Sequence, residues 1–352
     1  MSPSEPLRRR EFLGRVALGA SALGLARPAG GATAEAKAGA ASAARRPVLM
    51  KAGHQHDHSE TTLRALAAFG VNHICSGHLG RKVEEEWSVD ALLRLRKHVE
   101  SFGIALDAVP LPMSSSPIAR AEMPEILLAK DPERDRAIED ICTMIRHAGQ
   151  AGIPMVKYNL TFIGVVRTER TPGRGGASLS TFDYALGKQE PPLTEAGRIT
   201  EQIYWDRIEY FMKRVVPVAE EAKVKIALHP QDPGMPKGTG WRGVETVLGS
   251  VDGLKRFVET SASPYHGLNF CQGTVSEMLA KPGEEIYDVI RHIHVTNKLL
   301  ADTFRLYLGA TGANTAGTEL FFDFPVAAKG TYDYYCAMKM VSTDFQIGRA
   351  HV

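Results

Sequence analysis

The chain has 352 residues, of which 44% are hydrophobic and 23% are charged, and its formal net charge is +2. This composition is typical of a globular enzyme with enough apolar residues for a large core. The small net charge, without a basic stripe that carries aromatic residues, argues against a nucleic-acid-binding protein. No apolar stretch reaches the roughly 20 residues of a membrane helix, so we expect neither nucleic acid nor a membrane as a partner.

The four cysteines do not predict disulfides; they are Cys75, Cys142, Cys271 and Cys336. No two of them have CxxC spacing, and four in so long a chain do not make a disulfide framework. A buried, small apolar side chain is the usual role of such residues.

The first 46 residues have the features of an export signal. Arg8–Gly14 (RRREFLG) resembles a twin-arginine signal, and the apolar run Val16–Ala26 is too short for a good membrane span. Ala32–Ala34 (ATA) would suit a signal peptidase. We therefore expect residues 1–46 to be a signal peptide and linker and the protein to be periplasmic or otherwise exported. The alternative is a basic tail rich in alanine and glycine.

Strand and helix patterns alternate from residue 47 to about residue 345. Strands are predicted at residues 48–50, 71–75, 104–109, 153–159, 224–228, 267–271 and 293–296. Helices are predicted at residues 61–69, 89–102, 134–151, 199–222, 251–260, 284–290 and 332–341.

This alternation predicts βαβ units, a parallel sheet and the α/β fold of a (β/α)8 TIM barrel. Seven strands are one fewer than a closed barrel needs. The last seven residues, Gln346–Val352 (QIGRAHV), resemble a translated sequencing adapter, and we set them aside as an artefact. We expect residues 47–345 to be a catalytic domain that is incomplete at its C-terminus, with the eighth strand encoded beyond Phe345.

Two long loops rich in glycine and proline follow the fourth and fifth strands, at residues 167–192 and 231–243. Loops of this length are usually functional lids or else disordered. Both lie on the side of the barrel formed by the carboxyl ends of the strands, where active sites of this fold are found.

Side chains that bind metals close three consecutive predicted strands: His229, Cys271 and His294. Imidazole and thiolate are good ligands for Zn²⁺, Fe²⁺ or Mn²⁺. Alternation puts His292 on the same strand face as His294, so spacing does not choose between them. Each residue is also compatible with a structural role in the core.

Several motifs in this order resemble those of the mannonate dehydratase family. They are Trp87–Val89, Lys157–Asn159, Arg167–Thr168, Phe182–Tyr184, Phe211–Lys213, Pro217–Glu221, His229–Pro233 (HPQDP), Ser263–Thr274 (SPYHGLNFCQGT) and His294–Asn297 (HVTN). The resemblance spans residues 87 to 297 and favours His294 over His292. Gln231 and Thr296 stand where the family usually has Asp and Arg.

The resemblance implies a TIM barrel of the xylose-isomerase type that uses Mn²⁺ or Fe²⁺. Such an enzyme would dehydrate D-mannonate to 2-keto-3-deoxy-D-gluconate. A metal would hold the sugar acid and stabilise the developing charge, while a base removes the C2 proton and an acid protonates the leaving hydroxyl. The metal ligands carried over are His229, Cys271 and His294. The family's fourth ligand, an Asp in a Pro-Asp-His-Gly motif, and the adjacent His are absent, so the catalytic residues stay unassigned.

Three polar residues near the strand ends are candidates for substrate binding. The guanidinium of Arg167 matches two carboxylate oxygens, although a solvated loop arginine is equally compatible. Asn159 would bind hydroxyls or simply end its strand. Asp232 would orient substrate or His229, or form a turn between prolines.

Other functions stay open from the sequence. A metal-dependent sugar isomerase or epimerase would use similar ligands but keep the water in place. An exported sugar-binding protein or an inactive fragment is the alternative that is not an enzyme. The histidines of residues 54–58 suggest a second metal site, but a solvent-facing turn is favoured. The expected partner is a small-molecule sugar acid, and a homo-oligomer is compatible with the sequence.

Overall fold

The structure is a computed structural model that describes residues 49–52, 57–172, 174–235, 238–296, 303–309 and 319–325. The chain divides into two units, residues 1–46 and 47–352, and only the second contains described residues. The predicted signal peptide, the histidines at 54 and 56, the predicted helix at 332–341 and the C-terminal heptapeptide lie outside the described residues. No described helix is long and apolar enough to cross a membrane.

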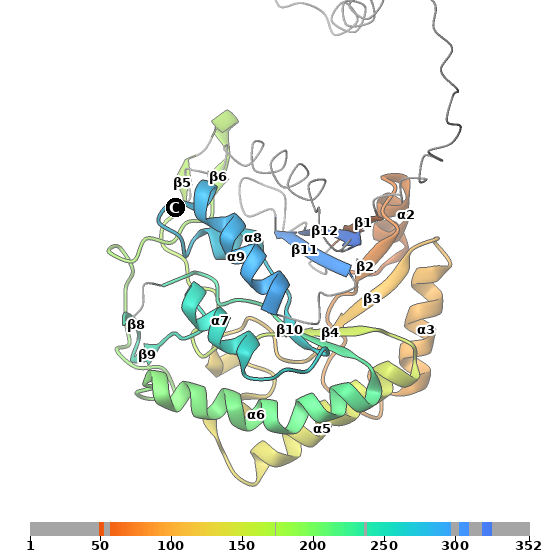
Figure 1. Cartoon of the computed structure of the whole chain (residues 1–352), viewed down its shortest axis with the longest axis horizontal. Helices are drawn as coiled ribbons and strands as arrows, with labels where there is room; N and C mark the ends of the chain where they lie inside the picture. Colours follow the sequence, from red (N-terminus) through yellow and green to blue (C-terminus); the bar gives the residue numbers. More distant parts are fainter. Residues whose placement is uncertain are drawn as a thin grey trace, which may run out of the picture. The chain divides into compact units, whose positions relative to one another are not determined.

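The main sheet has the strand order β10-β7-β4-β3-β2-β1-β12-β11 (Figure 1). These strands are β1 (Leu49–Ala52), β2 (His73–Cys75), β3 (Ala105–Pro110), β4 (Met155–Tyr158), β7 (Lys225–Leu228), β10 (His266–Leu268), β11 (Thr303–Gly309) and β12 (Glu319–Pro325). From β1 to β10, each strand of this sheet pairs in parallel with the strand of the same sheet that follows it along the chain. Helices lie between most of them, as in a (β/α) barrel. The predicted α/β fold and its first six strands are confirmed.

The helices that follow these strands form where the sequence spacing predicts them. The helices of the described residues are α2 (Glu60–Ala68), α3 (Val89–Glu100), α4 (Pro124–Leu128), α5 (Glu133–Gln150), α6 (Glu201–Ala222), α7 (Val251–Glu259), α8 (Gln272–Ser276) and α9 (Pro282–Thr296), with short 3-10 turns at Ile118–Arg120 and Arg174–Gly176. Four helices begin after a side-chain oxygen that accepts a backbone N–H of the first turn, a preferred N-cap. These caps are Ser59, Ser88, Thr200 and Ser250.

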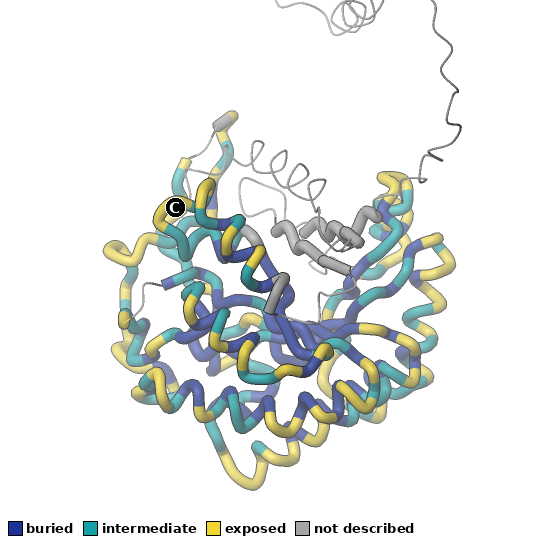
Figure 2. Tube along the Cα trace, viewed as in Figure 1, coloured by how far each residue is buried: buried dark blue, intermediate teal, exposed yellow. Residues whose placement is uncertain are grey.

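The core lies between the sheet and the helices, and Figure 2 shows buried strands surrounded by helices with exposed outer faces. Val156 and Tyr158 of β4 belong to this large cluster together with Trp205 of α6. Met155 alternates with them and belongs to a separate cluster with small side chains of neighbouring strands, including Ala227 of β7. Because successive strand residues point to opposite faces, the second cluster marks the inner face of the strands.

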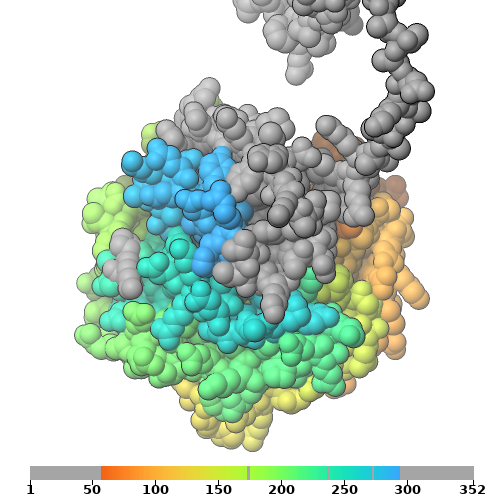
Figure 3. All heavy atoms as spheres, viewed as in Figure 1, coloured from red at the N-terminus to blue at the C-terminus, as the bar shows by residue number. Residues whose placement is uncertain are grey.

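The predicted seventh strand, at residues 293–296, is wrong. These residues form the last turn of α9, which begins at Pro282. Ile286, Ile290 and Ile293 are buried at helical spacing, so the apolar face of the helix continues through the segment. Figure 3 shows α9 beside α7 on the surface, and the two helices are in contact.

An antiparallel hairpin of β11 and β12 lies beyond β1 in the sheet, at the edge opposite β10. Neither strand is among the predicted elements. The two long loops contain small hairpins: β5 (Thr171–Pro172) pairs with β6 (Ser178–Leu179), and β8 (Gly240–Trp241) pairs with β9 (Val244–Glu245).

Replacing Thr200 by alanine is expected to destabilise the protein by about 1 kcal/mol, because α6 loses its N-cap. The Thr200 Oγ1 accepts the Ile203 N–H at 3.3 Å. Thr200→Ser keeps that oxygen and should stay close to the parent protein. Urea unfolding of the three proteins measures the difference, and equal midpoints for all of them would show that the cap contributes nothing.

Candidate functional site

Three predicted site residues lie at the same end of neighbouring parallel strands. Asn159 follows β4, His229 follows β7, and the segment leading to Cys271 follows β10. The His229 N–H donates to the Tyr158 carbonyl at 2.9 Å, so the pairing continues past the ends of β4 and β7. The structure therefore brings Asn159, His229 and Cys271 to one edge of the sheet.

Strand register shows that the side chains of Asn159 and His229 share the inner face. Ala227 lies in the inner cluster and pairs with Lys157 on β4 and with Gly267 on β10. Alternation then places the residues two positions later, Asn159 and His229, on that face as well. Lys157 is buried there. Lys157 is not among the predicted site residues, although strand alternation places it on the same face as Asn159, two positions later.

The His229 ring is fixed by its own backbone. Its Nδ1 lies 2.7 Å from the Pro230 carbonyl oxygen, which accepts a hydrogen bond from a protonated Nδ1. In neutral imidazole this tautomer makes Nε2 the basic nitrogen, the arrangement typical of histidine ligands in metal sites. The half-buried position of His229 is compatible with such a role.

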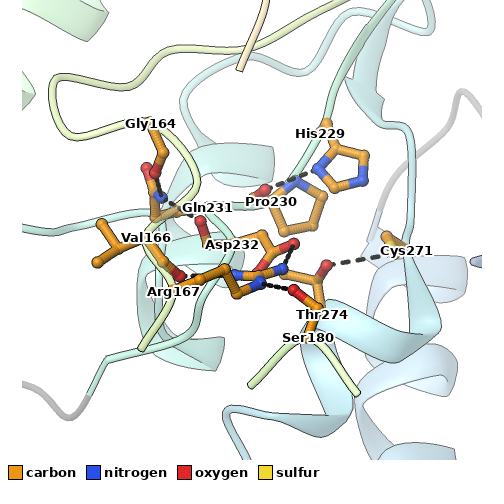
Figure 4. A network of polar contacts seen from close by, with 10 residues as sticks. All are labelled: Gly164, Val166, Arg167, Ser180, His229, Pro230, Gln231, Asp232, Cys271 and Thr274. Carbon is orange, nitrogen blue, oxygen red and sulfur yellow. Dashed lines mark hydrogen bonds and ion pairs between the residues drawn. The ribbon is translucent and has the colours of Figure 1, made fainter. Parts of the chain in front are cut away.

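Cys271 is a buried residue at the N-cap of α8. The hydroxyl of Thr274, also buried, donates a hydrogen bond to its sulfur at 3.3 Å. A donor to sulfur stabilises the thiolate, which is the form that binds metals. Figure 4 shows this contact between Thr274 and Cys271, and His229 with its contact to Pro230 in the same close-up.

His294 lies in α9 instead of at a strand end, and its side chain is outside the described part of the structure. Among the described residues, no group of three or more His, Cys, Asp or Glu side chains could hold a metal ion. The ligand set His229, Cys271 and His294 therefore stays a prediction, with two members at the same edge.

Arg167 and Asp232 form an ion pair that joins the two long loops. The Arg167 Nη2 donates to Asp232 Oδ2 at 2.7 Å, and its Nε donates to the Ser180 hydroxyl at 3.2 Å (Figure 4). Burial lowers the pKa of Arg167. The hydrogen bond and the charge of Asp232, and to a smaller extent the charge of Glu277, raise this pKa by more, so the pKa of Arg167 is raised overall. Arg167 is thus anchored in a fixed position rather than a solvated loop residue.

Glu277 is a buried carboxyl group beside this pair that was missed from the sequence. Burial, and then the charge of Asp232, raise its pKa to about 8, while Arg167 and the Gly234 backbone oppose the shift. Its Oε2 and the Oδ1 of Asp232 are buried without a hydrogen-bond partner in the described part of the chain. Burial and the neighbouring charge therefore favour the protonated form of Glu277.

Gln231 connects the loop after β7 to the loop after β4. Its buried side-chain Nε2 donates to the carbonyls of Gly164 at 2.9 Å and Asp232 at 2.8 Å (Figure 4). An ionised aspartate has no hydrogen to donate to these carbonyls. The amide of Gln231 therefore joins the two loops, and an aspartate at this position would not form these bonds.

The two loops are also joined away from this network. The Tyr184 hydroxyl donates to the Gly240 carbonyl at 2.8 Å, and the rings of Phe182 and Trp241 are 5.4 Å apart, edge to face. Arg242 donates through Nε to the Pro191 carbonyl at 2.7 Å. These contacts hold the two loops together as one unit.

Comparisons with known proteins agree with the fold and with the sequence motifs. Residues 54–191 and 183–305 match the family model of D-mannonate dehydratase (UxuA). The mannonate dehydratase of Thermotoga petrophila is 27% identical over 277 residues, which cover 68% of this chain and 71% of that protein. The Streptococcus suis protein of the same name is 28% identical, over 60% of this chain and 62% of its own length.

A solved structure gives the same result. The crystal structure of mannonate dehydratase from Streptococcus suis serotype 2 aligns with a TM-score of 0.58 and 25% identity, and it covers 79% of this chain and 76% of that one. The predicted resemblance, the fold class and the assignment to a family of hydro-lyases are confirmed. This chain belongs to the D-mannonate dehydratase family.

Proposed function

We propose that this protein removes water from D-mannonate, or from a related sugar acid, and releases 2-keto-3-deoxy-D-gluconate. The observation that carries the proposal is the placement of His229 and Cys271 at adjacent strand ends, within the region that matches the family. The fixed Nδ1 of His229 and the hydrogen-bonded sulfur of Cys271 suit the binding of a divalent metal.

We propose Mn²⁺ or Fe²⁺ as the cofactor, held by His229, Cys271 and His294. A mixed set of imidazole nitrogen and thiolate sulfur suits such ions better than Mg²⁺ or Ca²⁺. When bound, the metal would act as a Lewis acid on the oxygens of the sugar acid.

The polar residues around the strand ends would orient the substrate. The side-chain amide of Asn159 donates one hydrogen to the Met113 carbonyl at 3.3 Å. In our proposal, the second amide hydrogen and the amide oxygen of Asn159 bind hydroxyl groups of the substrate. Asp232 neutralises Arg167 at 2.7 Å, so this pair would bind hydroxyl groups of the substrate through a fixed donor and acceptor. In this role Arg167 binds substrate hydroxyls, whereas the sequence led us to expect that it would bind the substrate carboxylate.

Incubation of the purified full-length chain with D-mannonate and Mn²⁺ tests the function. We expect a 2-keto-3-deoxy acid as product by NMR, loss of turnover after chelation of the metal, and recovery when Mn²⁺ is added back. An epimeric product without loss of water would instead support a sugar epimerase. Turnover that survives exhaustive chelation would contradict the metal dependence.

A further inference from the structure

A polar pocket of about 380 Å³ lies beside the loops that follow β2, β3 and β4. It is lined by His78, Ser114, Ser115, Ser116, Pro117, Arg120, Glu122 and Val165. Val165 stands between Gly164, whose carbonyl accepts from Gln231, and Val166, whose carbonyl accepts from Arg167. The pocket and the site at the ends of β7 and β10 therefore share the loop after β4.

The walls of the pocket are held by contacts between the loops. The Ile118 N–H donates to the Phe162 carbonyl at 2.9 Å, which ties the loop after β3 to the loop after β4. Gly164 has a φ of +69°, and a Cβ at this position would lie 2.5 Å from the Pro117 nitrogen. Glycine is therefore required for this close approach, and the pocket is formed before a ligand binds.

The pocket also borders the inner face of the strands. Burial lowers the pKa of His78, the Glu122 carboxylate acts in the opposite direction, and the ammonium of Lys157 lowers it further. The Asn159 N–H also donates to the carbonyl of Met113 at 2.8 Å, and Met113 directly precedes Ser114 of the pocket, so the pocket begins beside the end of β4. A ligand that reaches from the strand ends toward β2 and β3 would enter the pocket.

The chemistry of the lining suits hydroxyl groups. Arg120 and Glu122 offset each other in charge, which disfavours a pocket specific for an anion. The Glu122 Oε2 accepts the Ser114 N–H at 3.1 Å, and the Ser114 hydroxyl donates to Ser116 at 2.9 Å. The side chains of Ser115 and Arg120 are in exposed positions and make no hydrogen bond to the described protein, so both are available to a ligand.

We propose that this pocket binds the hydroxyl-bearing tail of the sugar acid, from its fifth carbon onward, while the carboxylate end lies toward His229 and Cys271. The inference rests on the function proposed above. Dehydration changes only the second and third carbons, so the remaining hydroxyls stay intact and need a neutral, polar surface throughout the reaction. Ser115 and Arg120 contribute donors that discriminate a long polyhydroxylated acid from a short one.

The test compares D-mannonate with the four-carbon acid that has the same configuration at its second and third carbons. In the full chain with Mn²⁺, Ser115→Ala should weaken D-mannonate binding about 3- to 10-fold and Arg120→Gln about 10-fold. Binding of the four-carbon acid should be unchanged in both variants. Arg94→Gln removes a matched exposed arginine of α3, outside the pocket, and should change neither affinity. Calorimetry gives the affinities, and kcat and KM are measured in parallel.

The outcomes separate this inference from the proposed function. Equal losses for both acids, or no loss for D-mannonate, would overturn the pocket assignment even if the protein dehydrates D-mannonate. Selective loss of D-mannonate affinity without any dehydration would support the pocket and overturn the proposed reaction. If the parent protein binds neither acid, both proposals are wrong.

Discussion

Replacing Cys271 by serine is expected to lower the metal content of the purified protein at least several-fold. Serine has nearly the same shape, but its hydroxyl stays protonated at neutral pH and is a poor ligand for the softer divalent ions. The Thr274 hydroxyl, which donates to the Cys271 sulfur at 3.3 Å, would have an oxygen acceptor in the variant. The loss of metal should therefore not require a loss of fold.

Elemental analysis after loading with Mn²⁺ and desalting measures this effect. Cys142→Ser is a matched control, because Cys142 is also buried but lies in α5, away from the strand ends. Burial raises the pKa of the Cys142 thiol to about 11, so it stays protonated and does not bind metal at neutral pH. Unchanged metal content in Cys271→Ser would refute the ligand assignment, and equal losses in both variants would point to a general effect on folding.

The fold could be predicted wherever a segment was long enough to show its period. The helix at residues 134–151 shows three isoleucines on one stripe, Ile138, Ile141 and Ile145, and all are buried in α5. The segment at residues 293–296 is too short for this distinction, because four residues of which two are apolar fit a strand as well as one turn of helix. The preceding Ile286 and Ile290 settle the matter only when the whole of α9 is seen to pack with one face.

The site could be predicted in part. The sequence indicates where a strand ends, but it does not indicate which loop residues contact each other around the strand ends. His229 and Asn159 could be predicted because each lies at the end of an apolar strand. The pairing of Arg167 with Asp232 joins residues 65 positions apart, and it depends on how two loops fold over the strands. Glu277 gave no signal, since burial of a single acidic residue after a short helix follows only from tertiary packing.

The raised pKa of the Glu277 carboxyl group links the stability of the protein to pH. Its Met278 neighbour packs on Gly234, where a Cβ would lie 2.7 Å from the Met278 Cγ, and this contact holds the segment against the turn after Asp232. Burial and the Asp232 charge raise the carboxyl pKa from 4.5 to about 8 in the folded protein. The unfolded chain, which has the ordinary value, releases this proton at a much lower pH.

Between about pH 4.5 and 8 the folded state therefore binds a proton that the unfolded state has lost. The free energy of unfolding should decrease as the pH rises through this range and level off above it, as far as this group is concerned. Glu277→Gln keeps a neutral side chain of similar shape at every pH, so its stability relative to the parent protein should increase across the same range.

Urea unfolding at a series of pH values measures this difference. Glu220→Gln, at an exposed position of α6, is the control for the exchange of an ordinary carboxylate for an amide. Parallel curves for Glu277→Gln and the parent protein would mean that Glu277 ionises normally in the fold, and that Arg167 is balanced by two carboxylates instead of one.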